Sequence, residues 1–187
     1  MIIFVKISNM EENFKALEKY NFWNGNVPQL GFIRNSYLDR ILNYCNNKLI
    51  KVLVGQRRTG KSYILRQIAQ SLISNGTNPH NIFYLNKEFL AFDFVDNYVA
   101  LENLVQYYKA MLKPEGKIYL FIDEIQNITE WERFVNSCSQ DFTQDYEIFI
   151  SGSNSKMLSG ELATLLSGRF ISFEIFPFSF PEYVGFT

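Results

Sequence analysis

The stretch KVLVGQRRTGKSYIL, residues 51–65, constrains the fold more than any other part of this sequence. An apolar run leads into a loop that fits the pattern GxxxxGK followed by Ser or Thr, and a helical pattern comes next. Glycines in such a loop let backbone N–H groups curl around a phosphate without a side-chain clash. The helix that follows adds the positive end of its dipole. The stretch therefore predicts a strand, a phosphate-binding loop and a helix in succession.

We assign the contacts with the nucleotide to this loop and to the residue after it. The set is Gly55, Gln56, Arg57, Arg58, Thr59, Gly60, Lys61, Ser62 and Tyr63. Lys61 is expected to neutralise charge on the β- and γ-phosphates, which also makes it a catalytic residue, and Ser62 is expected to bind Mg²⁺. The side chains of Arg57 and Arg58 are explained as well by solvated surface as by contact with the ligand.

A second motif, IYLFIDEIQN at residues 118–127, indicates whether a bound nucleotide is cleaved. An apolar strand pattern ends at Asp123, and open α/β sheets bind their ligands at the carboxyl ends of the strands. Asp123 is expected to hold Mg²⁺ through water, and Glu124 to act as the general base on the attacking water. The alternative is that the two carboxylates only cap the strand and begin a loop.

Two further sites are less specific. The stretch FISGSNSKML places Ser153 or Asn154 beside the tips of the first and third strands, where a side chain can sense the γ-phosphate. A Gly/Ser turn in which Asn caps a helix is the competing interpretation. Arg169 in LLSGRF is either a surface residue or an arginine finger, which acts within its own chain or on a neighbouring subunit.

Strand-like runs alternate with helical patterns from residue 50 onward. The expected strands are 49–55, 81–86, 117–123, 146–152 and 169–175. Four of these runs are almost continuously apolar, which is typical of strands buried on both faces of a parallel sheet. A capping box formed by Thr129 and Glu132 is expected to begin one of the helices. The alternation predicts a layered α/β fold.

The composition excludes several kinds of chemistry. The chain of 187 residues has one histidine, His80, which rules out a Ser-His-Asp triad and the usual histidine-based metal sites. Cys45 and Cys138 stand far apart and indicate reduced thiols in a cytoplasmic protein. A net charge of −1 argues against a general polyanion binder. The apolar runs are strand-sized, so no membrane span is expected.

Together these motifs resemble an AAA-type ATPase, and more narrowly the bacterial and archaeal predicted ATPases that join such a domain to a C-terminal domain of uncertain function. The matching stretches, within about residues 20–187, are IRNSYLDRIL, VLVGQRRTGKSYIL, YLFIDEIQNITEWERFV, FISGSNSKML, LLSGRF and FPFSFPEY. The resemblance implies a three-layer P-loop NTPase fold, with a five-stranded parallel sheet of order 5-1-4-3-2 and Mg-ATP as the ligand. It also implies that Phe32, Ile33 and Arg34 line the adenine side.

The expected organisation has three parts: N-terminal lead-in helices at 1–47, the ATPase core at 48–176 and the start of a C-terminal region at 177–187. In relatives the stretch PFSFPEY opens a long continuation, so a further C-terminal domain or a partner chain is expected to cover the aromatic tail. A homo-oligomer is a further expected partner, and association with nucleic acid rests on analogy alone.

The leading functional hypothesis is a Mg²⁺-dependent ATPase core that couples ATP hydrolysis to the switching of an effector. The second hypothesis is an ATP-binding scaffold or regulatory module with negligible turnover. Phe89 in NKEF replaces the Asp of a guanine-reading loop, which disfavours GTP. A small-molecule phosphotransferase is disfavoured because only Arg133 and Arg169 follow residue 100, too few for an arginine-rich lid.

Overall fold

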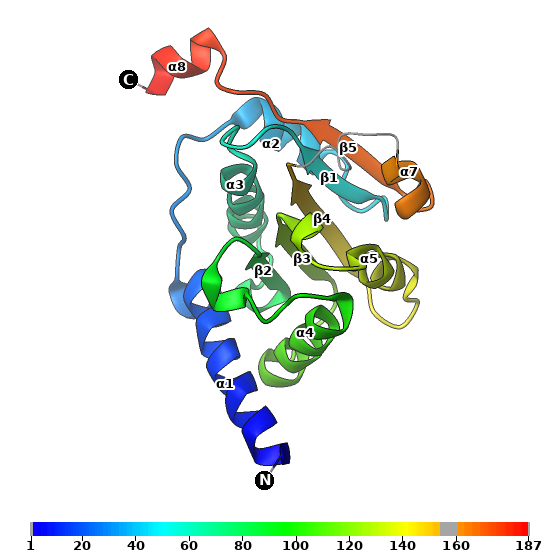
Figure 1. Ribbon diagram of the computed structural model, residues 1–187. Helices are drawn as coiled ribbons and strands as arrows, with labels where there is room; N and C mark the ends of the chain where they lie inside the picture. The colour runs from blue at the N-terminus through cyan, green and yellow to red at the C-terminus, as the bar shows by residue number, and fades with distance from the viewer. Residues whose placement is uncertain (1, 154–160, 187) are drawn as a thin grey trace.

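The apolar runs form a five-stranded sheet in the computed structural model, which describes residues 2–153 and 161–186 (Figure 1). The strands are β1 (Ile50–Val54), β2 (Ile82–Asn86), β3 (Ile118–Asp123), β4 (Tyr146–Gly152) and β5 (Phe170–Glu174). Neighbouring strands are all parallel, and their order is β2-β3-β4-β1-β5. This order confirms the predicted fold class, with its sheet order 5-1-4-3-2.

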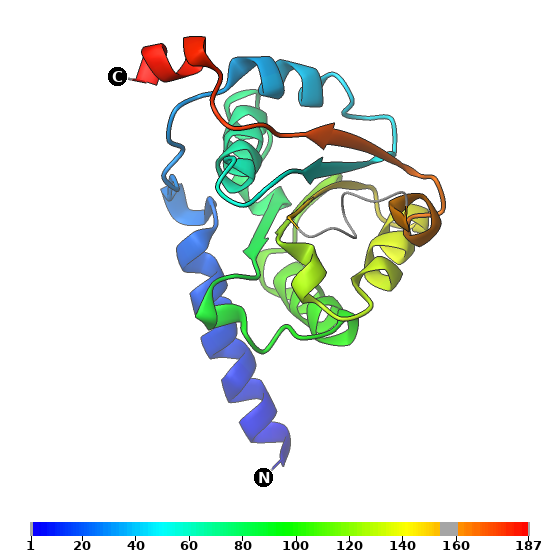
Figure 2. The same cartoon turned by 45° about the horizontal axis from the view of Figure 1, so that its top comes forward.

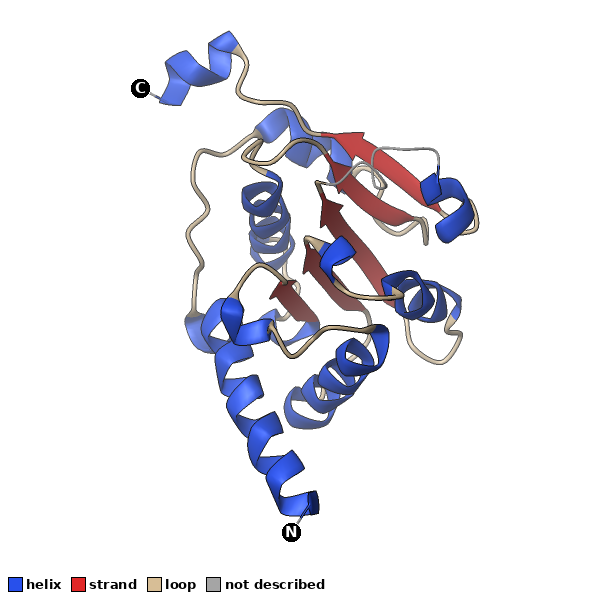
Figure 3. Cartoon of the chain, in the orientation of Figure 1, coloured by secondary structure: helices blue, strands red, loops and turns tan. Residues whose placement is uncertain are grey.

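Helices cover both faces of the sheet and make the molecule three-layered (Figure 3). The helices are α1 (Ile2–Tyr20), α2 (Asn35–Leu42), α3 (Lys61–Ser74), α4 (Tyr98–Leu112), α5 (Trp131–Gln140), α7 (Glu161–Leu165) and α8 (Phe180–Phe186), with short 3-10 helices at Trp23–Gly25, Pro79–Asn81, Leu90–Phe92 and Ile125–Asn127. None of the helices in these described ranges is both long and apolar enough to cross a membrane.

The core is divided into two apolar clusters by the sheet. One cluster packs α1, α4, α5 and α7 against the sheet, and the other packs α2 and α3 against it. Side chains alternate between the two, so that Val52 and Val54 belong to the first cluster and Leu53 to the second. Burial on both faces explains why the strand runs are almost continuously apolar. The edge strand β5 is the least buried of the five.

The N-terminal segment closes the other edge of the sheet, along β2 (Figure 2). The Asn21 side chain donates to the Tyr84 carbonyl oxygen at 2.9 Å and accepts from the Tyr84 N–H at 2.7 Å. The indole N–H of Trp23 donates to the Ile82 carbonyl oxygen at 2.8 Å. These side chains satisfy backbone groups that an edge strand otherwise leaves open.

The predicted capping box at the start of α5 is wrong. The helix begins at Trp131, and its N-cap is Glu130, whose backbone is left-handed (φ 54°) and whose side chain makes no cap hydrogen bond. The Thr129 backbone instead pairs with the segment before α4: its N–H donates to the Asp96 carbonyl oxygen at 2.8 Å, and its own carbonyl oxygen accepts from the Tyr98 N–H at 3.0 Å. This long-range pairing fixes the entry to the helix.

A buried ion pair joins the neighbouring strands β1 and β4 at the end of the sheet where β1 begins. The Lys51 ammonium on β1 contacts the Glu147 carboxylate on β4, and both side chains are at most 2% exposed. The Asn46 N–H donates to Glu147 Oε2 at 2.8 Å, and Lys51 also donates to Asn47 Oδ1 at 3.2 Å. Removal of one member of such a pair is costly, because the other charge stays buried and has lost its main partner.

We expect Lys51→Met to lower the free energy of unfolding by about 3 kcal/mol, because it leaves the buried Glu147 carboxylate with only the partly exposed Lys117, 3.5 Å away, as a cationic partner. The double variant Lys51→Met/Glu147→Leu should recover most of that loss, since it removes both charges. Urea unfolding followed by circular dichroism measures both values. A single variant that costs no more than the double variant would show that the pair does not matter to stability.

Candidate active site

The loop between β1 and α3 has the backbone geometry that its glycines suggest. At Gly55 an added Cβ would lie 2.4 Å from the Ile175 carbonyl oxygen, so only glycine fits there. Gly60, with φ at 95°, directly precedes the first residue of α3. The Thr59 hydroxyl donates to the Gln56 carbonyl oxygen at 2.9 Å and closes the loop on itself. The loop thus begins at a close approach to the end of β5 and ends at a helix N-terminus.

A cleft of about 780 Å³ lies next to this loop, within the usual size range of ligand sites. Its lining residues are Arg57, Arg58, Thr59, Gly60, Lys61, Ser62, Tyr63, Glu88, Glu124, Pro177 and Phe178. Most residues of the predicted nucleotide set therefore border one space. Arg57 also pairs with Glu88 at 3.0 Å on the exposed rim. Glu88, Pro177 and Phe178 were not placed at this site by sequence reasoning.

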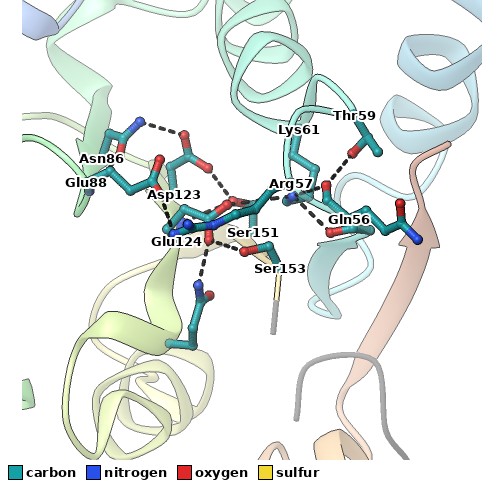
Figure 4. A network of polar contacts seen from close by, with 12 residues as sticks. Gln56, Arg57, Thr59, Lys61, Asn86, Glu88, Asp123, Glu124, Ser151 and Ser153 are labelled. Carbon is teal, nitrogen blue, oxygen red and sulfur yellow. Dashed lines mark hydrogen bonds and ion pairs between the residues drawn. The ribbon is translucent and has the colours of Figure 1, made fainter. Parts of the chain in front are cut away.

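Lys61 places a buried positive charge at the floor of the cleft. Its ammonium donates to the carbonyl oxygens of Gly55 at 3.0 Å and Gln56 at 2.9 Å. The same nitrogen lies 3.6 Å from Glu124 Oε1, on the other side of the site (Figure 4). The predicted phosphate-binding lysine and the predicted base therefore face each other.

Asp123 is fully buried behind the cleft and held by its neighbours on both sides. Asn86 donates to Asp123 Oδ2 at 2.9 Å, Tyr84 donates to the same oxygen at 3.2 Å, and the Ser151 hydroxyl donates to Oδ1. Burial raises the pKa of Asp123, while hydrogen bonds from Ser151 and Ser62 oppose that rise. Sequence reasoning missed Tyr84, Asn86 and Ser151, although two of them stand at polar positions near the ends of apolar strand runs.

Glu124 is turned toward Lys61 by the local backbone and by two side-chain donors. Its backbone is left-handed (φ 55°), and its N–H donates to the Ser151 hydroxyl at 3.1 Å. Gln126 donates to Glu124 Oε2 at 2.5 Å, and Ser153 donates to the same oxygen at 2.7 Å (Figure 4). The carboxylate is thus fixed through one oxygen, and its other oxygen faces Lys61. Gln126 was not identified from the sequence.

One predicted residue is not brought to the cleft, and another, Asn154, lies outside the described residues. Arg169 is exposed and precedes β5, where its carbonyl oxygen accepts from the Ile50 N–H at 2.9 Å. Because β5 runs parallel to β1, Arg169 sits at the starting end of β1, roughly 20 Å along the strand from Gly55. This position separates Arg169 from the cleft of its own chain.

The segment expected on the adenine side does not itself line the cleft. Of the described residues, those that line the cleft include none of Phe32, Ile33 and Arg34. Arg34 is buried at 3% exposure and donates to the Thr59 carbonyl oxygen at 3.0 Å, behind the loop. Pro177 and Phe178 are the lining residues nearest to this segment in the fold, and the Phe178 ring packs on Phe32 at a centroid distance of 5.6 Å.

A magnesium ion fits the oxygen atoms that the site offers. Mg²⁺ usually takes one or two protein oxygens and completes its shell with waters and phosphate oxygens. The Ser62 hydroxyl and the Asp123 carboxylate are close enough to influence each other electrostatically, and they supply such oxygens, Ser62 directly and Asp123 through water. Within residues 2–153 and 161–186, no group of three or more His, Cys, Asp or Glu side chains is arranged to hold a metal ion. The ion would therefore depend on waters and phosphate oxygens for the rest of its shell.

We expect Gly55→Ala to destabilise the fold by a few kcal/mol and to weaken nucleotide binding, because the new Cβ would strike the Ile175 carbonyl oxygen. Gly76→Ala is the matched control, since Gly76 also has positive φ (97°) but has nothing within 4 Å of an added Cβ. The control should cost about 1 kcal/mol and leave binding unchanged. Thermal unfolding and calorimetric titration with an ATP analogue measure the two effects. Equal losses in both variants would contradict the close-approach argument.

Comparison with known proteins agrees with this geometry. A family model described as AAA domain matches residues 47–184. An uncharacterized protein of Haemophilus influenzae is 40% identical over 151 residues, which cover 81% of this chain and 37% of that protein. An uncharacterized protein of Methanocaldococcus jannaschii is 37% identical over 140 residues, which cover 73% of this chain and 28% of that protein. The chain thus spans about a third of the length of these curated relatives.

Among solved structures, the Aeropyrum pernix ORC1 protein, determined in complex with DNA, superposes with a TM-score of 0.55. The match covers 90% of this chain and 51% of that chain at 14% sequence identity. At this identity the likeness shows a shared fold.

Proposed function

This chain belongs to the family of AAA domains, and from that premise we propose that it is a Mg²⁺-dependent ATPase core. Family membership implies nucleotide binding. The observation that carries the proposal of hydrolysis is the position of Glu124, which faces Lys61 across the cleft with its carboxylate fixed by Gln126 and Ser153. A carboxylate that only ended a strand would need no such support.

The phosphate end of ATP is bound by the loop. Backbone N–H groups of residues 55–62 and the Lys61 ammonium supply positive charge to the β- and γ-phosphates. Ser62 and Asp123 are the residues that would hold Mg²⁺, which would supply positive charge beside the phosphate oxygens. Tyr84, Asn86 and Ser151 keep the Asp123 carboxylate in place through their hydrogen bonds.

Glu124 accepts a proton from the attacking water. Its Oε2 is engaged by Gln126 and Ser153, so Oε1 is the oxygen directed at the cleft. Phosphate competes with Glu124 for Lys61, because both are anions beside one ammonium group. Nucleotide binding therefore frees Oε1 for the water at the moment when catalysis needs it. In this proposal Ser153 orients the base, and a sensing role for Ser153 or Asn154 at the γ-phosphate is retained as a further proposal.

A neighbouring copy completes the site in this proposal. Arg169 is exposed at the starting end of β5, far from its own cleft, and so acts as a finger only on the nucleotide of another subunit. The ATPase core extends over residues 48–176 in this proposal, and a C-terminal region begins at residues 177–187. The hydrolysis cycle would switch an effector attached beyond the core. The DNA in the ORC1 structure belongs to that protein, and nucleic acid as a partner of this chain rests on fold analogy alone.

A second candidate is an ATP-binding scaffold or regulatory module with negligible turnover. The position of Arg169 favours it for the isolated chain, because this arginine does not reach the chain's own cleft. In this case the nucleotide would set conformation or assembly without being consumed.

We expect Glu124→Gln to reduce the turnover of ATP by about 10²–10⁴-fold, the usual contribution of a general base. Binding of ATP should be retained or strengthened, because Lys61 loses its competing carboxylate. Lys61→Ala should abolish binding and turnover together. Steady-state release of phosphate and calorimetric titration measure the two properties.

Glu132→Gln is the matched control, because it makes the same chemical change at a half-buried position in the first turn of α5, outside the residues that line the cleft, and should behave as the wild type. Turnover that persists in Glu124→Gln would exclude Glu124 as the base. Tight ATP binding by the wild type without turnover would select the scaffold.

We expect Gln126→Leu to lower kcat by about 10–100-fold with little change in the Kd for ATP, because the base loses a hydrogen bond to a charged group. Gln140→Leu, on the exposed end of α5, is the control for loss of a surface amide. Single-turnover kinetics separate the chemical step from binding. An unchanged chemical step would mean that Ser153 alone is enough to orient Glu124.

A further inference from the structure

Arg34 connects parts of the chain that are far apart in sequence. Its Nη1 donates to the carbonyl oxygens of Thr59 at 3.0 Å and Phe176 at 2.9 Å. Its Nε and Nη2 donate to the two carboxylate oxygens of Glu182, at 2.8 and 3.0 Å. A planar guanidinium is suited to such paired contacts, and the side chain is only 3% exposed. One buried residue thus links the phosphate-binding loop to the C-terminal segment.

The position of Arg34 is itself fixed by the fold. Its N–H donates to Gln67 Oε1 at 3.2 Å, and the Gln67 amide donates to the Leu30 and Phe32 carbonyl oxygens at 2.7 Å. The guanidinium carbon lies 4.4 Å from the centroid of the Tyr37 ring. Helices α2 and α3 therefore fix the position of this arginine, and the C-terminal segment binds to it through Phe176 and Glu182.

The C-terminal segment is defined as residues 176–186, and most of it is exposed to solvent. Every residue from Phe176 to Gly185 except Glu182 is exposed, and Phe180 is 79% exposed. The Ser179 N–H and hydroxyl both donate to Glu182 Oε2 at 2.9 Å, so Glu182 also caps the start of α8. The hydrogen bonds from Arg34 hold the pKa of Glu182 at about 2, well below its usual value. The carboxylate therefore both begins α8 and anchors it.

The same contacts reach both sides of the cleft. Thr59 lines it within the phosphate-binding loop, and Pro177 and Phe178 line it within the C-terminal segment. The Arg34 guanidinium touches the Thr59 backbone and lies 5.2 Å from the centroid of the Phe178 ring. A ligand that contacts both walls binds best when the segment is attached, because detachment removes Pro177 and Phe178 from the site.

We propose that Arg34 is a positioning residue that couples occupancy of the cleft to attachment of the C-terminal segment. The coupling is reciprocal: attachment of the segment tightens nucleotide binding, and a bound nucleotide slows detachment of the segment. The proposal rests on the proposed function only in taking the ligand to be a nucleotide. It needs no hydrolysis, so it applies equally to an ATPase and to a scaffold.

The test uses Glu182→Gln in the full chain with a non-hydrolysable ATP analogue and Mg²⁺. Glutamine retains the capping role toward Ser179 but loses the charge that Arg34 binds. We expect amide hydrogen exchange in residues 180–186 to become at least about tenfold faster, and the Kd for the analogue to rise about tenfold. In the wild type the analogue should slow exchange in that segment, and in the variant this protection should be lost.

Two further variants separate the coupling from a general loss of structure. Arg34→Lys keeps the charge but not the paired geometry, and should give an intermediate change in both measurements. Glu132→Gln should change neither. A looser segment with an unchanged Kd would overturn the coupling alone, as would unchanged exchange in Glu182→Gln. Failure of the wild type to bind the analogue would overturn the proposed function. This outcome is independent of the hydrogen-exchange rates measured without nucleotide.

Discussion

The register of β2, β3 and β4 is the constraint on which the rest of the site depends. Asn86 pairs with Asp123 across β2 and β3, and Ile122 pairs with Ile150 across β3 and β4. Because side chains alternate along a strand, Asn86, Asp123 and Ser151 share the face that α3 covers. Ser151 then bridges the two acidic residues, accepting from the Glu124 N–H and donating to Asp123. The register of these three strands therefore determines the positions of both the Asp123 and the Glu124 carboxylates.

Local patterns in the sequence were sufficient for the strands and for the centre of the site. Each strand is a short apolar run that ends at a turn, and burial on both faces leaves that pattern clear. Gly55, Lys61 and Ser62 belong to a contiguous motif, and Asp123 and Glu124 follow a strand directly, so their placement needed no long-range information. The sheet order came from the family resemblance, because strand patterns alone do not say which strands are neighbours.

Residues whose roles depend on distant partners were not predictable. Gln126 looks like any polar loop residue until the turn after Glu124 brings its amide onto the carboxylate. Arg34 and Glu182 are 148 positions apart, and the only local signal, Ser179 with Glu182 three residues later, indicates a helix cap and no arginine. Thr129 gave a false cap signal for the same reason, since its backbone is taken by residues 96–98.

The buried pair of Lys51 and Glu147 has a consequence for how the sheet assembles. A shift of one residue between β1 and β4 would turn one of these side chains to the opposite face of the sheet, and two bare charges would enter separate apolar clusters. The pair therefore discriminates against misaligned strands during folding. The correct alignment also sets how far β1 extends before the phosphate-binding loop begins, relative to Ser151 at the end of β4. An ion pair at one end of the sheet thus acts as a check on the accuracy of the site at the other.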